Sequence, residues 1–467
     1  MHSDRKSGLY IWKKMEMTGN SRNDDSIISV IGISFIVGMG GLVFGYGIAA
    51  IAGVLDLIKS EFKLSEFGEQ AIVGVLVLGC FIGATMAGAV SARWGRRRTI
   101  TLATVLGVLG HALIVASPGM TGLLVGRSVV GLCIGLLSMV VPMYAAEATP
   151  ARYRGAVVSL FQLAITLGIL AAYGVALCFA AVLPWPFLLG AGVLPVGLCL
   201  LAIQILPESP RWLAAKGDRD GAFEAAKALG LANEWRERSS EAEAGVSAGS
   251  GEIRRGSTIA VLLFCSTLFI LQNLSGIDGI LYYAPRIFRE LGFSEGTAAL
   301  AATFGLGLVN VLATIAAMAL VDRLGRRPLL ILGSVAMAAG LAVVVGASLL
   351  AMPWLGLGGL ALFIAAFAFS LGPLPYVLMS ELFPTQIRES GIAAASATSW
   401  LFNALIAFTF LSLVALAGLS GAIGVFLAVC LIAVLFCLAY VPETRGASLE
   451  EIEANVLSGR PLRRLGN

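Results

Sequence analysis

Long apolar stretches separated by short polar gaps run through nearly the whole chain. Most stretches are close to the ~20 residues that an α-helix needs to cross the hydrocarbon core of a bilayer. The pattern predicts twelve membrane-spanning helices, at residues 27–50, 69–90, 99–116, 121–145, 155–180, 186–206, 256–281, 298–321, 328–350, 356–380, 392–416 and 420–441. Six spans precede the longest polar segment and six follow it. We therefore expect an all-α membrane protein with six helices in each half.

Short polar motifs recur in the two sets of spans, separated by about half of the chain. The basic gap at 93–97, Arg-Trp-Gly-Arg-Arg, recurs at 323–327 as Arg-Leu-Gly-Arg-Arg. Two further pairs keep nearly the same separation: Glu147 and Arg154 with Glu381 and Arg388, and Pro207-Glu208-Ser209 with Pro442-Glu443-Thr444. A repeat of this length indicates two copies of one structural unit. Many secondary transporters are duplicated membrane halves with the substrate site between them.

The repeat and the polar segments divide the chain into five predicted parts. These are an N-terminal tail at 1–26, a six-helix half at 27–206, a linker with short helices at 207–255, a second six-helix half at 256–441 and a C-terminal tail at 442–467. The two six-helix parts are expected to be pseudo-symmetric, because they carry the same motifs in the same order.

Lysine and arginine are distributed unevenly between the two sides of the predicted bundle. Only Lys59, Lys63, Arg286 and Arg289, of 32 basic residues, fall in loops on the side opposite the termini, and Arg127 lies inside a span. Cytoplasmic loops carry the excess of Lys and Arg in membrane proteins. We therefore expect both termini in the cytoplasm and a multi-pass protein of the plasma membrane, which is the inner membrane in a bacterium.

The composition of the chain excludes several classes of protein function. The chain is 58% hydrophobic and 13% charged, against roughly 25% charged residues in soluble domains. No GxxxxGK[ST] phosphate-binding pattern is present, so an ATP-driven pump within this chain is not expected. The seven cysteines all fall inside predicted spans and are interpreted as packing residues. We expect no enzyme activity, no cofactor, no metal and no nucleic-acid partner, and a monomer.

Taken together, the ordered motifs resemble the sugar porter family of the major facilitator superfamily, over roughly residues 30–455. The motifs that carry the resemblance are Gly131, Gly135, Pro142, Tyr144, Glu147 and Arg154, then 207–212 (PESPRW), 272–276 (QNLSG), Tyr282-Tyr283, 372–375 (GPLP) and 442–446 (PETRG). The resemblance implies the major facilitator fold and alternating-access transport of a monosaccharide, a hexose or a pentose, across the lipid bilayer.

Isolated amides within apolar spans are the candidate sugar ligands. A sugar presents hydroxyls on a ring with apolar faces, so its site needs amides, hydroxyls and aromatic rings. The amides are Gln162, Gln272, Asn273, Asn310 and Asn403, and Trp400 lies one turn before the last of them. Such amides also serve helix–helix hydrogen bonds in membrane bundles. The resemblance favours sugar contact for these positions, and Tyr376 stands where many relatives carry Trp.

Three ionisable residues, Arg127, Asp278 and His111, lie well inside predicted spans, where charged groups are unfavourable and usually face a cavity. Proton-coupled members of the family carry an acid directly after a Phe-Gly-Tyr triplet, whereas Gly47 follows that triplet at 44–46. Arg127 matches the partner of the missing acid, and Asp278 stands where most relatives have Asn. Either Asp278 binds sugar and couples transport to protons, with Arg127, or the protein is a uniporter of a sugar or polyol. We interpret His111 as a packing histidine.

The repeated motifs at the cytoplasmic helix ends combine acids with arginines. Contacts that form when this side closes and separate when it opens are what alternating access requires. The alternative is that the arginines only set the topology. The predicted gating network comprises Arg93, Arg97, Glu147, Arg154 and Glu208 in the first half and Arg323, Arg327, Glu381, Arg388 and Glu443 in the second.

A non-transporting sugar sensor on the same fold is the alternative from another functional class. A sensor is expected to carry a long signalling tail, whereas the predicted tails at 1–26 and 442–467 are short. The sequence therefore favours a transporter.

Overall fold

The computed structural model describes residues 4–116, 119–236, 255–294, 296–384, 387–447 and 449–465, and regular structure in these ranges is helical. The N-terminal portion of the described chain, before residue 237, contains α1 (Asp4–Ala49), the short 3-10 helix η1 (Ala50–Gly53), α2 (Leu55–Phe62), α3 (Glu66–Trp94), α4 (Arg96–Ala116), α5 (Met120–Ala148), α6 (Ala151–Phe179), α7 (Trp185–Gly190), α8 (Val193–Ile203), α9 (Pro210–Ala215) and α10 (Arg219–Ala228). The C-terminal portion, from residue 255 onward, contains α12 (Arg255–Leu274), α13 (Ile277–Glu290), α14 (Thr297–Leu324), α15 (Arg326–Leu350), α16 (Pro353–Phe369), α17 (Leu374–Leu382), α18 (Arg388–Tyr440), α19 (Leu449–Leu457) and η2 (Leu462–Arg464).

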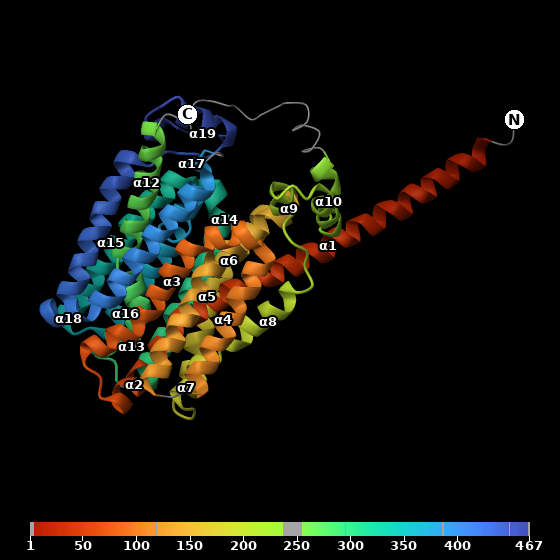
Figure 1. The fold of residues 1–467 in the computed structure, drawn as a ribbon. Coiled ribbons are helices and arrows are strands. Elements are labelled where there is room, and N and C mark those ends of the chain that lie inside the picture. Colours follow the sequence, from red (N-terminus) through yellow and green to blue (C-terminus); the bar gives the residue numbers. More distant parts are fainter. Residues whose placement is uncertain are drawn as a thin grey trace.

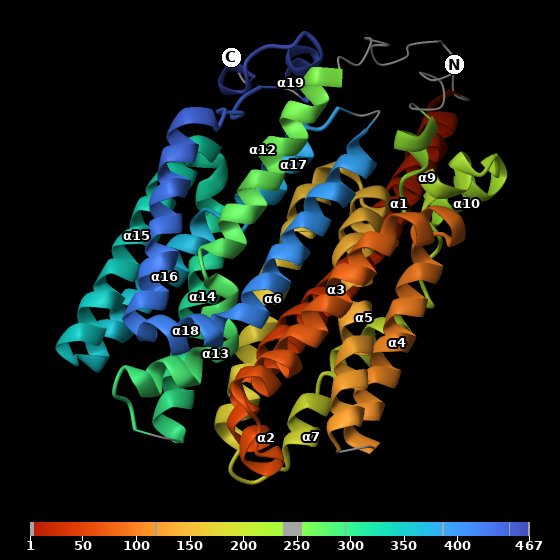
Figure 2. The same cartoon turned by 60° about the vertical axis from the view of Figure 1, so that its left-hand side comes forward.

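Eleven helical stretches of the described chain are long and apolar enough to cross a bilayer. The last, Ser390–Tyr440, has 51 residues, more than twice the length of one crossing. Its backbone leaves the helical conformation at Gly418 (φ 70°, ψ 172°), and Figure 2 shows the two limbs of α18 meeting at a bend. Because this reversal falls between the predicted spans 392–416 and 420–441, α18 contains two crossings and the bundle has the twelve helices that the sequence predicts.

The helices form two groups, each of six crossings. In the first, α3 packs on α5, α1 on α6 and α4 on α5; in the second, α15 packs on α16 and α18, and α12 on α18. Figure 2 shows the groups side by side. They meet where α3 packs on α18 and α6 on α14. We call the end that carries α9, α10 and α19 the terminal end, and the end that carries α2, α7 and the last turn of α13 the far end (Figure 1).

Two crossings of the second half are broken in the middle. The seventh changes from α12 to α13 at Ser275 and Gly276, and the tenth from α16 to α17 at residues 370–373. Gly276 has a φ of 87°, and a Cβ atom there would lie 2.3 Å from the Phe426 ring. Glycine therefore permits both the turn and the close approach. Irregular backbone at membrane depth persists only where protein or a cavity surrounds it, so the breaks mark the place to search for a site.

Candidate functional site

A polar cluster joins α12, α13 and α18 beside the first helix break. The Tyr282 hydroxyl donates to Asn403 Oδ1 at 2.8 Å, and the Asp278 carboxyl lies near the same amide side chain. Asn273 Nδ2 donates to Ser399 Oγ at 3.1 Å. Asp278 lies in the first turn of α13, where the free N–H groups of a helix favour negative charge. The break thus gathers a carboxyl, two amides and two hydroxyls that are distant in sequence.

Gln272 contributes a polar atom that has no partner. Its Nε2 donates to the Gly372 carbonyl at 3.1 Å, a group at the second helix break. Its Oε1 is buried and accepts no hydrogen bond from the described residues. Leaving a buried acceptor unsatisfied costs about 1–3 kcal/mol. A ligand hydroxyl would remove this penalty, so Gln272 Oε1 is the clearest candidate contact.

Aromatic rings lie against the same cluster. Tyr376 packs its ring on Phe269, with centroids 4.8 Å apart, and its hydroxyl lies near Ser399. Trp400 packs on Phe44 of α1, with centroids 5.3 Å apart. The ring contact between α1 and α18 crosses from one half to the other. The cluster therefore lies at the interface of the halves, mostly on second-half residues.

Two predicted sugar ligands lie on other helices than those of this cluster. Gln162 lies on α6 and Asn310 on α14, two helices that pack on each other across the halves. In the described part of the chain, no side-chain hydrogen bond connects either amide with the cluster. Conversely, Tyr282, Ser399 and Phe44 belong to the cluster although the sequence analysis did not propose them as ligands. A hydroxyl or a ring in an apolar span gives no sequence signal that separates a ligand from a packing residue.

The predicted proton-coupling pair is not in contact. Arg127 is 2% exposed, and its Nε donates to the Ile72 carbonyl at 2.7 Å. No ion pair joins it with Asp278 among the described residues. His111 lies near Arg127, and its Nδ1 is 2.7 Å from the Gly107 carbonyl. Because a carbonyl only accepts, Nδ1 carries the hydrogen.

At the terminal end, the charged motifs of the first half contact one another. Arg96 donates from Nε and Nη2 to the Glu147 carboxylate at 2.9 and 2.8 Å. Glu208 accepts from the backbone N–H groups of Arg96 and Arg97 at 2.8 and 3.0 Å. Its carboxylate thereby satisfies the free donors at the start of α4. The Ser209 hydroxyl donates to Glu147 and joins the two acids.

The second half repeats this network, except that the Nε atom of Arg326 makes no hydrogen bond among the described residues. Arg326 donates to Glu381 at 3.1 Å, and Glu443 accepts from the backbone N–H groups of Arg326 and Arg327, each at 3.1 Å. The Thr444 hydroxyl donates to Glu381 at 2.6 Å, in the position that Ser209 occupies in the first half. The sequence repeat is therefore also a repeat of side-chain geometry.

The remaining arginines of the predicted network have other positions. Arg97 and Arg327 donate to the carbonyls of Gln204 (2.6 Å) and Leu438 (3.1 Å). Arg154 and Arg388 donate to the carbonyls five residues before them, at 3.3 and 3.1 Å. Arg93 and Arg323 are exposed. Arg96 and Arg326, which begin α4 and α15, form the ion pairs with Glu147 and Glu381.

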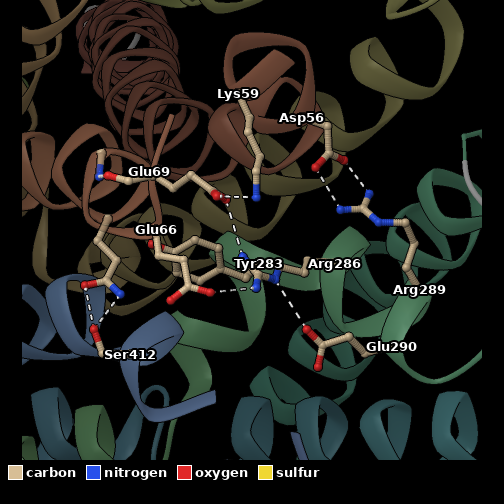
Figure 3. A network of polar contacts seen from close by, with 12 residues as sticks. Asp56, Lys59, Glu66, Glu69, Tyr283, Arg286, Arg289, Glu290 and Ser412 are labelled. Carbon is tan, nitrogen blue, oxygen red and sulfur yellow. Dashed lines mark hydrogen bonds and ion pairs between the residues drawn. The ribbon is translucent and has the colours of Figure 1, made fainter. Parts of the chain in front are cut away.

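A second charged network lies at the far end, between the two halves (Figure 3). Glu69 of α3 is 1% exposed and pairs with Lys59 of α2 at 2.6 Å. Arg286 of α13 approaches both Glu69 and Glu66 at 3.5 Å. Because Arg286 belongs to the second half and the acids to the first, these ion pairs join the halves.

Two further contacts close the far end. Arg289 binds the Asp56 carboxylate with two nitrogens, one of them at 2.7 Å. The Gln70 side chain and the Ser412 hydroxyl are 2.9 Å apart and hydrogen-bonded. In the sequence, the basic residues at this end indicate only the topology. Their signal was the presence of acids, Asp56, Glu66 and Glu69, next to the few basic residues of this side.

The family model "Sugar (and other) transporter" matches residues 33–456. The chain belongs to the sugar porter family of the major facilitator superfamily. This sugar porter is 35% identical to the galactose-proton symporter of Escherichia coli (strain K12), over 93% of this chain and 96% of that protein. It is 33% identical to the arabinose-proton symporter of the same strain, over 93% and 95%. It is also 33% identical to the D-xylose transporter of Levilactobacillus brevis, over 91% and 95%.

Comparison with solved structures supports this family assignment. The proton:xylose symporter XylE bound to 6-bromo-6-deoxy-D-glucose matches with a TM-score of 0.78 and 30% identity, over 92% of this chain and 99% of that chain. An inward-open structure of the xylose transporter XylE from E. coli matches with a TM-score of 0.75 and 30% identity, over 91% and 99%. The sugar porter is therefore a multi-pass membrane transporter and not an enzyme.

We predict that Arg286→Gln loosens the far end of this sugar porter. The variant removes the ion pairs between the halves at Glu66 and Glu69, and partly exposed pairs of this kind contribute about 1 kcal/mol. That corresponds to about a fivefold change in the ratio of closed to open molecules. Distances between spin labels at Phe67 and Trp354, in a background without the exposed Cys178, measure the opening.

Lys63→Gln is the matched control for this experiment. It removes one positive charge from the same end, but Lys63 makes no ion pair among the described residues. The control should keep the wild-type distance distribution. Equal broadening in both variants would show that total charge, and not the contact of Arg286, holds the far end closed.

Proposed function

We propose that this protein transports a monosaccharide across the membrane by alternating access, in symport with a proton. The observation that carries the proposal is the polar and aromatic cluster at the α12–α13 break. It offers a free buried acceptor on Gln272, amides and hydroxyls that are already oriented, and the Trp400 ring for an apolar sugar face. Relatives over more than nine tenths of the chain are named as galactose, arabinose and xylose transporters. A hexose or a pentose is therefore the substrate class.

The proposed substrate site comprises the cluster together with the two amides on the packed helices α6 and α14. Its residues are Gln162, Gln272, Asn273, Asp278, Asn310, Tyr376, Trp400 and Asn403, to which the geometry adds Tyr282, Ser399 and Phe44. A site between two halves has access to either side of the membrane as the halves rock.

The charged networks indicate which units of the protein are proposed to move. Each terminal-end network ties helices of one half together, so residues 27–206 and 256–441 act as two rigid units. The far-end network joins the units and holds that end closed. When the far-end contacts separate, the units can tilt toward one another at the terminal end, as alternating access requires.

The proposed orientation places both termini in the cytoplasm. The far end carries Lys59, Lys63, Arg286 and Arg289, and the other basic residues of the loops lie toward the terminal end, as the positive-inside rule requires. The protein is then a monomer of the plasma membrane, with the far-end network on the outer side.

Asp278 is the proposed proton carrier. It is the acid that lies in the cluster, near Asn403, and an ionisable residue at this depth is a functional candidate by default. Gly47 bears no side chain that could exchange a proton. The uniporter is the second candidate function, because a carboxyl near Asn403 can also serve as a sugar ligand alone.

We expect Gln272→Ala to weaken sugar binding by about 1–3 kcal/mol, the effect of leaving a buried partner unpaired. Dissociation constants for D-galactose, D-xylose and L-arabinose, measured on purified protein, test this. Gln204→Ala, an exposed amide outside the cluster, should bind all three sugars as the wild type does. Unchanged affinity in Gln272→Ala would place the site elsewhere.

Glu381→Gln should slow net transport while leaving sugar affinity within about tenfold, or ~1.4 kcal/mol. The reason is that Glu381 contacts Arg326 and Thr444 at the terminal end and not the cluster. Glu147→Gln, its counterpart in the first half, should behave alike. Transport and equilibrium binding are measured in proteoliposomes and in detergent. Loss of binding with an unaltered ratio of inward to outward molecules would contradict this role.

Asp278→Asn should abolish uphill accumulation but keep downhill counterflow, because an amide still hydrogen-bonds sugar but carries no exchangeable charge. Counterflow and pH-driven uptake of labelled sugar in proteoliposomes separate the two activities. Asp220→Asn, an exposed acid of α10, is the control and should retain both. If the wild type moves no protons with sugar, the protein is a uniporter and Asp278 is a ligand only.

A further inference from the structure

Arg127 is a buried cation without an acidic partner. The residue is 2% exposed, in the middle of α5. One of its nitrogens, Nε, donates to the Ile72 carbonyl, and no carboxylate in the described chain forms an ion pair with it. A buried charge without compensation has an effective penalty of several kcal/mol. The fold therefore requires something more than one carbonyl around this guanidinium.

The titratable side chains around Arg127 are all neutral in their ordinary state. They are the hydroxyls of Tyr282 and Tyr283, the thiol of Cys80 and the imidazole of His111. Asp278 is not among them, because its carboxyl lies against Asn403. In the described chain, the side chains next to this positive charge are thus dipoles, and no carboxylate forms an ion pair with it.

Arg127 lines a small cavity. It is lined by Gly47, Leu76, His111, Arg127, Val130 and Leu189. The space available to the centre of a water-sized sphere is about 10 Å³, which is about what one such particle needs. Without movement of its walls, a cavity of this size does not hold a sugar or gluconate. It admits one particle close to water in size.

We propose that this cavity binds one small monovalent anion, chloride or bromide, that balances the charge of Arg127. The anion takes the place that a side-chain carboxylate would take in an ion pair. Both the size of the cavity and the sign of the uncompensated charge select this class of ligand. The inference does not rest on sugar transport, because it follows from the surroundings of Arg127 alone.

Gly47 determines whether the anion is needed. A Cβ atom on Gly47 would meet Ile134 Cδ1 at 2.5 Å, the mobile end of a flexible side chain, so a larger residue fits after Ile134 rotates. An aspartate there would bring its own carboxylate to the cavity wall beside Arg127. The chain itself would then supply the counter-charge, and the halide would lose its site.

The test measures halide binding to the full-length purified protein without sugar. The protein is prepared with gluconate as the only anion and titrated with chloride, bromide or more gluconate at constant ionic strength. Chloride and bromide should raise the melting temperature in a saturable manner, as expected for a ligand that binds only the folded state. Gluconate, which is too large for the cavity, should not. Radiolabelled chloride should bind with a stoichiometry of one per chain.

Two variants at one position locate the site. Gly47→Asp should lose both the halide-dependent shift and the bound radiolabel, and should melt in gluconate at or above the wild-type temperature. Gly47→Ala imposes the same contact on Ile134 without adding charge, so it should keep the halide response.

Three results would overturn the proposal. The first is a wild-type melting temperature that responds equally to chloride and gluconate. The second is a halide shift of the same size in Gly47→Asp, which would place the ion on the surface. The third is the absence of bound radiolabel, which would leave only water beside Arg127. The wild-type titration decides the question even if one variant does not fold.

Discussion

The absence of water from the bilayer core is the constraint on which the rest of this structure depends. Backbone groups at that depth must pair within the protein, so each crossing is helical and irregular backbone is confined to the interior. In this chain the backbone is irregular within two crossings, at Ser275-Gly276 and at 370–373. Because each break frees backbone groups, polar side chains gather there, and Gln272 spans the two breaks by donating to the Gly372 carbonyl. The position of the candidate site thus follows from where the helices are permitted to stop.

The duplication provides the second organising element. Arg96, Glu147 and Glu208 in one half, and Arg326, Glu381 and Glu443 in the other, make the same contacts at the same end. In each half one acid binds an arginine side chain and the other satisfies the first backbone donors of the next helix. Every one of these contacts lies within a half. At the far end the ion pairs of Arg286 and Arg289 instead connect the halves, so rigidity within each unit and contact between the units use separate residues.

The interior charges show how the two halves differ in spite of the repeat. The first half buries Arg127 among neutral groups, and the second places Asp278, which is half-buried, near an amide and a tyrosine. An ion pair between them would have neutralised both, but the fold holds them apart. We propose a mobile partner for each of them, a proton for the acid and a small anion for the arginine. Gly47 is central to this arrangement because it leaves space where a side chain could have supplied the charge.

The sequence alone determined the number of crossings, the duplication, the family and the identity of most cluster residues, because span length, motif order and isolated polar residues are local properties. It even marked the chain reversal at Gly418 as a gap between two spans. Only the tertiary structure decided which charges meet. It paired Glu147 with Arg96 and not Arg93, separated Arg127 from Asp278, and turned the loop charges of Lys59, Glu69 and Arg286 into a link between halves. Such pairings depend on the direction of side chains on helices that pack across hundreds of residues, and no local pattern records that direction.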